Sequence, residues 1–276
     1  MRRARGGAGP VLAAGLTAGL LVAGAACGGS DDEPATDSLS TVEVPVGADT
    51  TSATQPVDYR SAMESRLTQE WGDPGVVAAV LESIGPDGLA AWEARVPLAD
   101  VATTELLDYA PPGAPAEELD AVVVFAFGNR VAADGTVTPG PMNEDLADVT
   151  AELVARHPVP VFAQWEVARY LEADGVPGVT SIEPTVDADG KVVYLSTRGV
   201  ADVVAGSGEA ARGRIGVICF ADHQGRCLLT ARAAGLDATA IEGVELPATY
   251  DPESGQPWTR DRVAYLSGDV MARLIT

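Results

Sequence analysis

Histidine, cysteine and basic residues are scarce in this chain of 276 residues. Its two histidines and three cysteines are dispersed, and they do not have the spacing that zinc and other metal sites require. We therefore predict neither a metal site nor a cofactor. Eighteen basic residues face forty acidic ones, which gives a formal net charge of −22. Such an acidic surface repels phosphate backbones, so we expect no nucleic-acid partner.

Common catalytic motifs are missing as well. The strongest predicted strand is not followed by a complete G-x-G-x-x-G spacing, and neither a P-loop nor a G-x-S-x-G elbow occurs. The stretch Ser196-Thr197-Arg198 lacks the local pattern of a serine hydrolase. The sequence therefore indicates where this protein is located more clearly than which reaction it performs.

The N-terminus has the order of a secretory signal. Arginines at positions 2, 3 and 5 precede an uncharged run from Val11 to Ala26, and small residues lead into Cys27. This end resembles a lipobox, which implies that Cys27 becomes the lipidated first residue of the mature protein. The departure is Gly24, where that pattern usually has leucine or valine. A plain secretory signal and an uncleaved anchor helix are the alternatives, and the apolar run is too short to favour the helix.

Residues 27–57 are rich in Ser, Thr, Asp, Gly and Pro and show no apolar periodicity, which predicts a disordered tether. Anionic lipid headgroups repel the acidic body, so membrane attachment must come from acyl chains on Cys27. Two or more chains on one cysteine suffice for stable anchoring. We therefore expect the lipid bilayer as a partner and a location at the extracytoplasmic face of the cell membrane.

Helical spacing of apolar residues begins at residue 58. Tyr59, Met63 and Leu67 lead to Trp71 in a first helix, residues 76–84 predict a second, and residues 89–92 a third. Residues 58–110 are therefore expected to form a helical extension that packs on the main domain.

Strands alternate with helices from residue 120 to the C-terminus. The run 121–127 is continuously apolar, as in a central strand of a parallel sheet. Further strands are predicted at 159–163, 191–195, 214–220 and 239–244, and helices at 143–156, 166–171, 200–204, 223–234 and 260–274. This alternation predicts an α/β fold with a doubly wound, mostly parallel Rossmann-like sheet.

Cys219 and Cys227 fall in a buried strand and in the helix that follows it. A disulfide between them is conceivable in an oxidising compartment. Buried free thiols are favoured instead, because free cysteine is among the most buried residue types.

Ligands of such folds bind beyond the carboxyl ends of the strands, and two loops there carry charged residues. After the first strand, Gly128-Asn129-Arg130 offers backbone amides and an arginine for an anion. The alternative is a turn glycine beside a surface arginine. After the second strand, Trp165 is a candidate for stacking and Glu166 for a catalytic base. The alternative interpretation is a buried tryptophan next to a glutamate at the start of a helix, with neither residue in a site.

A third loop, from Asp222 to Arg226, is the strongest candidate for chemistry. His223 and Arg226 are three residues apart, so both project from one side of the first helical turn. Arg226 is placed to hold a phosphate or carboxylate, with His223 as proton donor or acceptor. In the alternative, Asp222 caps the helix and His223 covers its end.

These features carry a resemblance over roughly the last 155 residues. The strand and loop from Asp120 to Gly128, the Thr138-Pro139 helix start and above all His223-x-x-Arg226 are similar to the YdcF/SanA/ElyC-like domain-of-unknown-function family. The resemblance implies a Rossmann-like, envelope-associated protein. This chain departs from the family by having fewer glycines after the first two strands.

Two functions fit these observations. In the first, a membrane-tethered envelope protein binds an anionic or nucleotide-like small molecule at the loop of Asp222, His223 and Arg226. In the second, an enzyme acts on an envelope precursor or nucleotide-like compound, with His223 as acid or base and Arg226 stabilising negative charge. The reduced glycine loops favour the first, and a purely structural lipoprotein is third.

Overall fold

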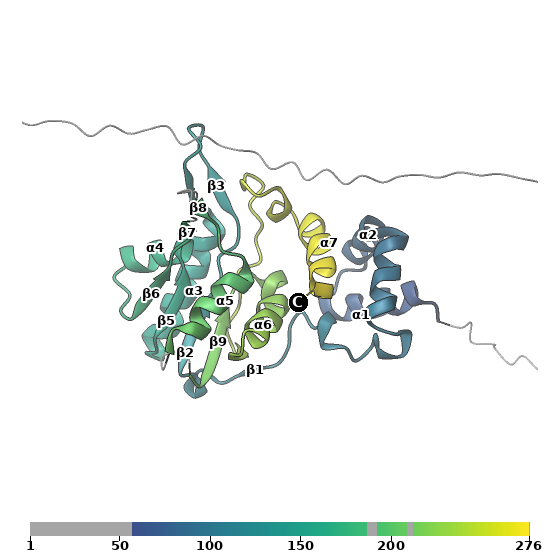
Figure 1. Ribbon diagram of the computed structural model, residues 1–276, viewed down its shortest axis with the longest axis horizontal. Helices are drawn as coiled ribbons and strands as arrows, with labels where there is room; N and C mark the ends of the chain where they lie inside the picture. Colours follow the sequence, from purple (N-terminus) through teal and green to yellow (C-terminus); the bar gives the residue numbers. More distant parts are fainter. Residues whose placement is uncertain (1–56, 187–191, 209–211, 276) are drawn as a thin grey trace, which may run out of the picture. The chain divides into compact units, whose positions relative to one another are not determined.

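A parallel sheet of six strands forms the centre of the computed structural model (Figure 1). The structure describes residues 57–186, 192–208 and 212–275, so the predicted signal, Cys27 and the tether up to residue 56 lie outside the described residues. The strand order is β1-β10-β9-β2-β5-β6, and every pairing in this sheet is parallel. The chain is thus an α/β protein with a Rossmann-like doubly wound sheet, as predicted.

The elements follow the predicted alternation closely. The strands of the central sheet are β1 (Gly113–Ala114), β2 (Ala121–Val124), β5 (Val161–Gln164), β6 (Val179–Ile182), β9 (Arg214–Ile218) and β10 (Asp237–Ile241). The main helices are α1 (Tyr59–Trp71), α2 (Pro74–Arg95), α3 (Pro141–Arg156), α4 (Trp165–Ala173), α5 (Thr197–Gly206), α6 (Gln224–Ala233) and α7 (Arg262–Ala272).

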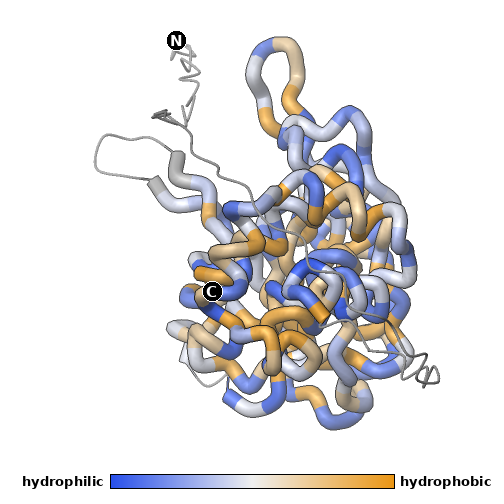
Figure 2. Tube along the Cα trace, turned by 90° about the vertical axis from the view of Figure 1, so that its right-hand side faces the viewer, coloured by the Kyte–Doolittle hydropathy of each residue, from blue (hydrophilic) through white to orange (hydrophobic). Residues whose placement is uncertain are grey.

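Alternation along β2 divides the core into two layers. Val122 and Val124 face the layer that contains α3 and α4, whereas Val123 and Phe125 face the layer that contains α5 and α6. All of them are buried, which explains why this strand has an unbroken apolar sequence. Figure 2 shows apolar segments mainly in the interior of the fold and polar segments on many of the outer turns.

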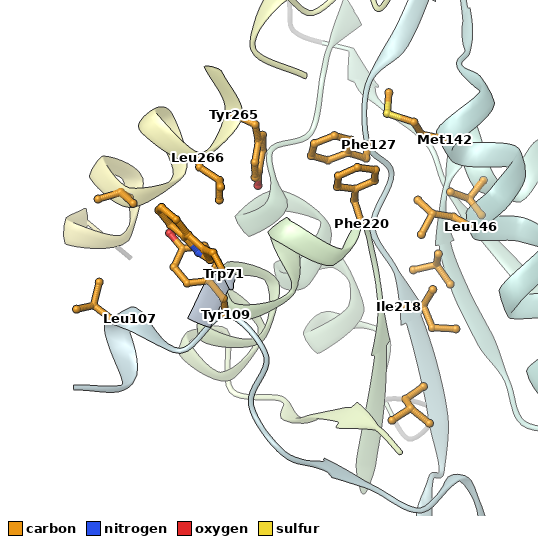
Figure 3. Close-up of a cluster of buried hydrophobic side chains, with 14 of the residues drawn as sticks. Trp71, Leu107, Tyr109, Phe127, Met142, Leu146, Ile218, Phe220, Tyr265 and Leu266 are labelled. Carbon is orange, nitrogen blue, oxygen red and sulfur yellow. The ribbon is translucent and has the colours of Figure 1, made fainter. Parts of the chain in front are cut away.

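The helical extension packs against the last helix of the chain. Asp58 caps α1 by accepting a hydrogen bond from the amide of Ser61, and Asp73 caps α2 in the same way. The second and third predicted helices are parts of α2, with a break at Gly85, whose φ is 64°. Side chains of α1, α2 and α7 share one apolar cluster with the sheet. Figure 3 shows Trp71 of α1, Leu266 of α7 and Ile218 of β9 among its members.

The predicted strand at 191–195 is not part of the central sheet. Its described part is β8 (Val192–Val193), which pairs antiparallel with β7 (Thr185–Val186) in a separate ribbon. The outer strand of the sheet on this side is β6, which the sequence analysis missed. It contains Thr180 and Ser181 and is only partly buried, so it lacks the apolar run on which strand prediction depends.

A second hairpin was also missed. The strands β3 (Asn129–Val131) and β4 (Val137–Pro139) project from the top of the molecule in Figure 1. Each has three residues and an exposed face, so periodicity cannot reveal it.

The two cysteines of the domain are buried free thiols, which confirms the favoured interpretation of Cys219 and Cys227. Among the described helices, none is long and apolar enough to cross a membrane.

Candidate functional site

A pocket of about 450 Å³ opens at the carboxyl ends of β2, β5 and β9. The chain winds from β2 towards β5 on one side, and β9 lies on the other side of β2. This reversal of winding direction is where doubly wound folds bind ligands. The side chains and loops that line the pocket are those of Ala126, Phe127, Gly128, Gln164, Tyr194, Leu195, Ser196, Thr197, Arg198, His223, Arg226, Thr230, Ala233, Gln256, Trp258, Thr259, Tyr265, Ala272 and Ile275.

His223 and Arg226 lie together in this pocket. A short 3₁₀ turn, Ala221–His223, follows β9 and leads directly into α6, so both side chains come from the start of one helix. His223 is buried, and its Nε2 lies 3.3 Å from Oγ1 of Thr197 at the start of α5. Nδ1 of the same ring lies 3.9 Å from Oδ1 of Asp269 on α7.

Asp269 is fully buried and joins two arginines. Its Oδ1 accepts a hydrogen bond from Nε of Arg226, and its Oδ2 accepts one from Nε of Arg273. Burial alone would raise the pKa of Asp269, but the guanidiniums of Arg273 and Arg226 outweigh it and lower the pKa to about 2. Two positive charges therefore share one carboxylate, and the cluster has an excess of positive charge.

Arg226 forms the side of this cluster that faces the pocket. Its Nη2 donates to the hydroxyl of Tyr265 at 3.0 Å, and Tyr265 in turn donates to Asp269 at 2.9 Å. Its Nη1 is 3.5 Å from Oγ1 of Thr197, a long contact that leaves this nitrogen able to donate to a ligand.

Aromatic rings support the site from below. Phe127 and Phe220 are stacked with their centroids 4.1 Å apart, and Tyr265 meets Phe127 edge to face at 4.8 Å (Figure 3). On the other side of the cluster, the guanidinium of Arg273 lies 3.6 Å from the centroid of the Tyr109 ring. These contacts fix the positions of the charged groups before any ligand arrives.

The first turn of α5 lines the pocket beside His223 and Arg226. The hydroxyl of Ser196 accepts a hydrogen bond from the amide of Gly199 and so caps the helix. Helix geometry leaves the amides of Thr197 and Arg198 without partners inside the helix, at its positive end. Arg198 is exposed and pairs with Asp202 one turn later, at 2.7 Å.

The loop after β2 contributes Gly128 to the pocket, but not Asn129 or Arg130. Gly128 has a φ of 68°, and a Cβ there would come within 2.5 Å of the Met142 side chain. Arg130 instead pairs with Asp251 at 2.9 Å, and the backbone carbonyl of Asn129 accepts from the amide of Gly255. These two residues hold the C-terminal segment in place.

Asp222 also lies outside the lining of the pocket. Its carboxylate accepts two hydrogen bonds from Arg262 on α7 and a third from the hydroxyl of Tyr250. Asp222 therefore fixes α7 to the start of α6, beside the pocket.

Glu166 is buried behind the pocket rather than in it. Its side chain has no exposed surface, and neither carboxylate oxygen has a hydrogen-bond partner among the described residues. Burial raises its pKa from 4.5 to about 8, and Glu183 adds to the shift. The residue of this loop that reaches the pocket is Gln164, whose Oε1 accepts from the amide of Ala126 at 3.2 Å.

Sequence reasoning missed Asp269, Tyr265 and Trp258. Asp269 and Tyr265 lie on α7, and no local motif connects this helix with the loop of His223. Trp258 lies in the 3₁₀ turn η6 (Pro257–Thr259), and 55 % of its surface is exposed at the pocket. The sequence shows that a tryptophan is present here but not that it is exposed, and exposure is what marks a binding surface.

No protein-family model matches this chain, and neither a curated protein nor a solved structure is significantly similar to it. Among the described residues, no group of three or more His, Cys, Asp or Glu side chains is placed to hold a metal ion.

Proposed function

We propose that this protein is a membrane-tethered envelope lipoprotein whose YdcF-like α/β domain binds an anionic, nucleotide-like small molecule at the pocket of His223 and Arg226. The observation that carries the proposal is the shared carboxylate of Asp269, which leaves positive charge at Arg226 on the pocket wall. The site is recessed, so water weakens this charge less than it would at an open surface.

The start of α5, beside Arg226, adds to the attraction. The positive end of α5 carries a partial charge of roughly half a unit and unpaired amides, both of which favour an anion. The hydroxyls of Ser196 and Thr197 and the amide of Gln256 also line the pocket. A phosphate or carboxylate bound against both Arg226 and this helix start would therefore find donors from both.

The mouth of the pocket supports a ring on the same ligand. Trp258 and Tyr194 both line it, with 55 % and 42 % of their surfaces exposed. Exposed aromatic faces stack on planar ligands, and stacking on a nucleobase contributes about 1–3 kcal/mol per base. A volume of about 450 Å³ lies within the range of small-molecule sites. These features together favour a nucleotide-like ligand over a bare inorganic anion.

The membrane part of the proposal rests on the sequence from Met1 to the tether. The basic start, the apolar run and Cys27 supply the anchor, and a body of strong negative charge supplies no alternative electrostatic attachment. In this account the lipid brings the pocket to the envelope, and the pocket itself faces the aqueous compartment.

Thermal unfolding in the presence of a panel of anions tests the binding function. We would use AMP, inorganic phosphate, citrate and, as a neutral comparison, adenosine. A ligand at 100 times its Kd stabilises the protein by about 2.7 kcal/mol. For a domain of this size, that corresponds to a rise in Tm of roughly 5–10 °C. We expect AMP to raise Tm more than phosphate or adenosine does.

Arg226→Gln is the informative variant, and Arg232→Gln is its matched control. Both arginines lie on α6, but Arg232 donates to the carbonyl of Ala238 and does not line the pocket. Each variant is compared with its own ligand-free Tm, so a loss of basal stability does not obscure the result. A shift that survives Arg226→Gln, or is absent for every anion with the wild-type protein, would overturn the binding function.

A further inference from the structure

The hydroxyl of Thr197 lies between the two functional side chains of the pocket. Its Oγ1 is 3.3 Å from Nε2 of His223 and 3.5 Å from Nη1 of Arg226. Thr197 is half-buried and lines the pocket, so a ligand can reach this oxygen. A hydroxyl beside an imidazole and a guanidinium is the arrangement of an activated oxygen nucleophile.

Helix capping does not account for this hydroxyl. The cap of α5 is Ser196, whose Oγ accepts from the amide of Gly199. Thr197 is the first residue of the helix, and among the described residues its hydroxyl contacts His223 in the turn before α6 and Arg226 on α6. The oxygen is therefore available for chemistry in the pocket.

The surroundings of His223 favour the tautomer that a general base needs. Nδ1 is buried without a hydrogen-bond partner among the described residues, and it faces the Asp269 carboxylate at 3.9 Å. A proton on Nδ1 is attracted by that carboxylate, which leaves the lone pair of Nε2 directed at Thr197. Asp269 acts here through His223 and is a positioning residue.

We propose that Thr197 is the nucleophile and His223 the general base of a phosphomonoester hydrolase, an activity that rests on the anion-binding function proposed above. Arg226 and the first amides of α5 hold the phosphoryl oxygens. A phosphate ester fits better than a carboxylic ester, because the positive charge lies within 3.5 Å of the nucleophile itself. That charge would face the phosphoryl oxygens at the reacting centre.

The reaction proceeds in two balanced steps. Nε2 of His223 takes the Thr197 proton as Oγ1 bonds to phosphorus, the bond from phosphorus to the ester oxygen breaks, and the departing alkoxide takes the proton from His223. Water then attacks phosphorus and gives a proton to His223, and the bond from phosphorus to Oγ1 breaks as Thr197 regains its proton. The products are inorganic phosphate and an alcohol, with no oxidation or reduction.

Three phosphomonoesters serve as probes: 4-nitrophenyl phosphate, AMP and glycerol phosphate. The purified wild-type protein is expected to release phosphate from at least one of them. Thr197→Val, which keeps the shape and removes the hydroxyl, should lower the rate at least 100-fold, and His223→Gln should do the same. Thr197→Ser should retain activity within about tenfold of wild type, since it keeps the nucleophilic oxygen.

Arg169→Ala is the control for the surface charge of the protein. Arg169 is 57 % exposed and pairs with Glu183 on the far side of α4, outside the pocket lining, so its removal should leave the rate unchanged. Acid quenching during turnover, followed by peptide mass analysis, should find one phosphoryl group on the peptide that contains Thr197.

The tautomer of His223 gives a second, independent measurement. Nitrogen NMR of the two histidines, assigned with His157→Gln, should place the His223 proton on Nδ1 in the wild-type protein, and this preference should be lost in Asp269→Asn. A proton on Nε2 in the wild type would contradict the role as base.

The outcomes separate this proposal from the binding function. If no probe is hydrolysed while AMP still raises Tm, the hydrolase is wrong and the binding function stands. If Thr197→Val hydrolyses as fast as wild type, Thr197 is not the nucleophile. If 4-nitrophenyl acetate is cleaved and none of the phosphates is, the substrate class is wrong.

Discussion

Replacing Glu166 with glutamine should make the stability of this protein less dependent on pH. Glu166 is fully buried in the first turn of α4, and its carboxylate oxygens have no partners among the described residues. Burial raises its pKa from 4.5 to about 8, so the folded protein keeps a proton that the unfolded chain releases. The sign follows from this difference: the contribution of Glu166 to stability is complete below pH 4.5 and is lost as pH rises towards 8.

The magnitude follows from the same interval. One pKa unit corresponds to about 1.4 kcal/mol, so the loss approaches about 1.4 kcal/mol per pH unit above the unfolded value. Summed from pH 4.5 to 8, it amounts to roughly 5 kcal/mol. Glu166→Gln has nearly the same shape and cannot ionise. A buried amide without partners costs a constant amount, so the slope with pH, not the offset, identifies the effect.

Urea unfolding of wild type and Glu166→Gln at pH 5, 6, 7 and 8 measures this slope. We expect the variant to gain on the wild type steadily as pH rises. Glu172→Gln is the matched control, because Glu172 lies on the same helix but is exposed, and its effect should stay within about 0.5 kcal/mol at every pH. Parallel stability curves for wild type and Glu166→Gln would show that the folded protein does not hold a proton on Glu166 in this pH range.

Three further predictions concern the anchor, the pocket floor and the pocket mouth. Cys27→Ala should abolish palmitate labelling of the protein in cells, whereas Cys219→Ala should not, and labelling that survives Cys27→Ala would contradict lipidation at that residue. Gly128→Ala should lower the free energy of unfolding by about 1–3 kcal/mol more than Gly135→Ala does, because both glycines have positive φ but only the first would meet a side chain. Equal losses in urea unfolding would show that the Met142 side chain moves aside for the added Cβ. Trp258→Phe should remove most of the tryptophan fluorescence change that AMP causes, because Trp71 and Trp92 are buried and Trp165 does not line the pocket; an unchanged signal would place the ring of the ligand elsewhere.

The sequence was a good guide to the central sheet, because its strands are defined by burial on both faces. The run 121–127 predicted β2, and every residue of that strand is buried. The same logic failed at β6, where only Ile182 is buried and the other three residues are half-buried or exposed. It failed again at 191–195, where β8 pairs locally with β7. An apolar run predicts a strand, but it does not identify the neighbouring strand with which it pairs.

The site was predictable only where one loop supplies it. His223 and Arg226 could be paired from their spacing, and the structure brings both into the pocket. Asp269 could not be found in this way, because its position beside them depends on how α7 packs against the start of α6 in the tertiary structure. Glu166 shows a second limit of sequence reasoning. Its place directly after a strand made it a candidate for the pocket, but the sequence does not show that its side chain lies outside the pocket lining.

The binding function is best tested by a structure of the protein with AMP bound. We expect the phosphate within hydrogen-bond distance of Arg226 and the start of α5, and the adenine ring against Trp258. A phosphate bound away from Arg226, or a pocket that stays empty at an AMP concentration that raises Tm, would contradict it.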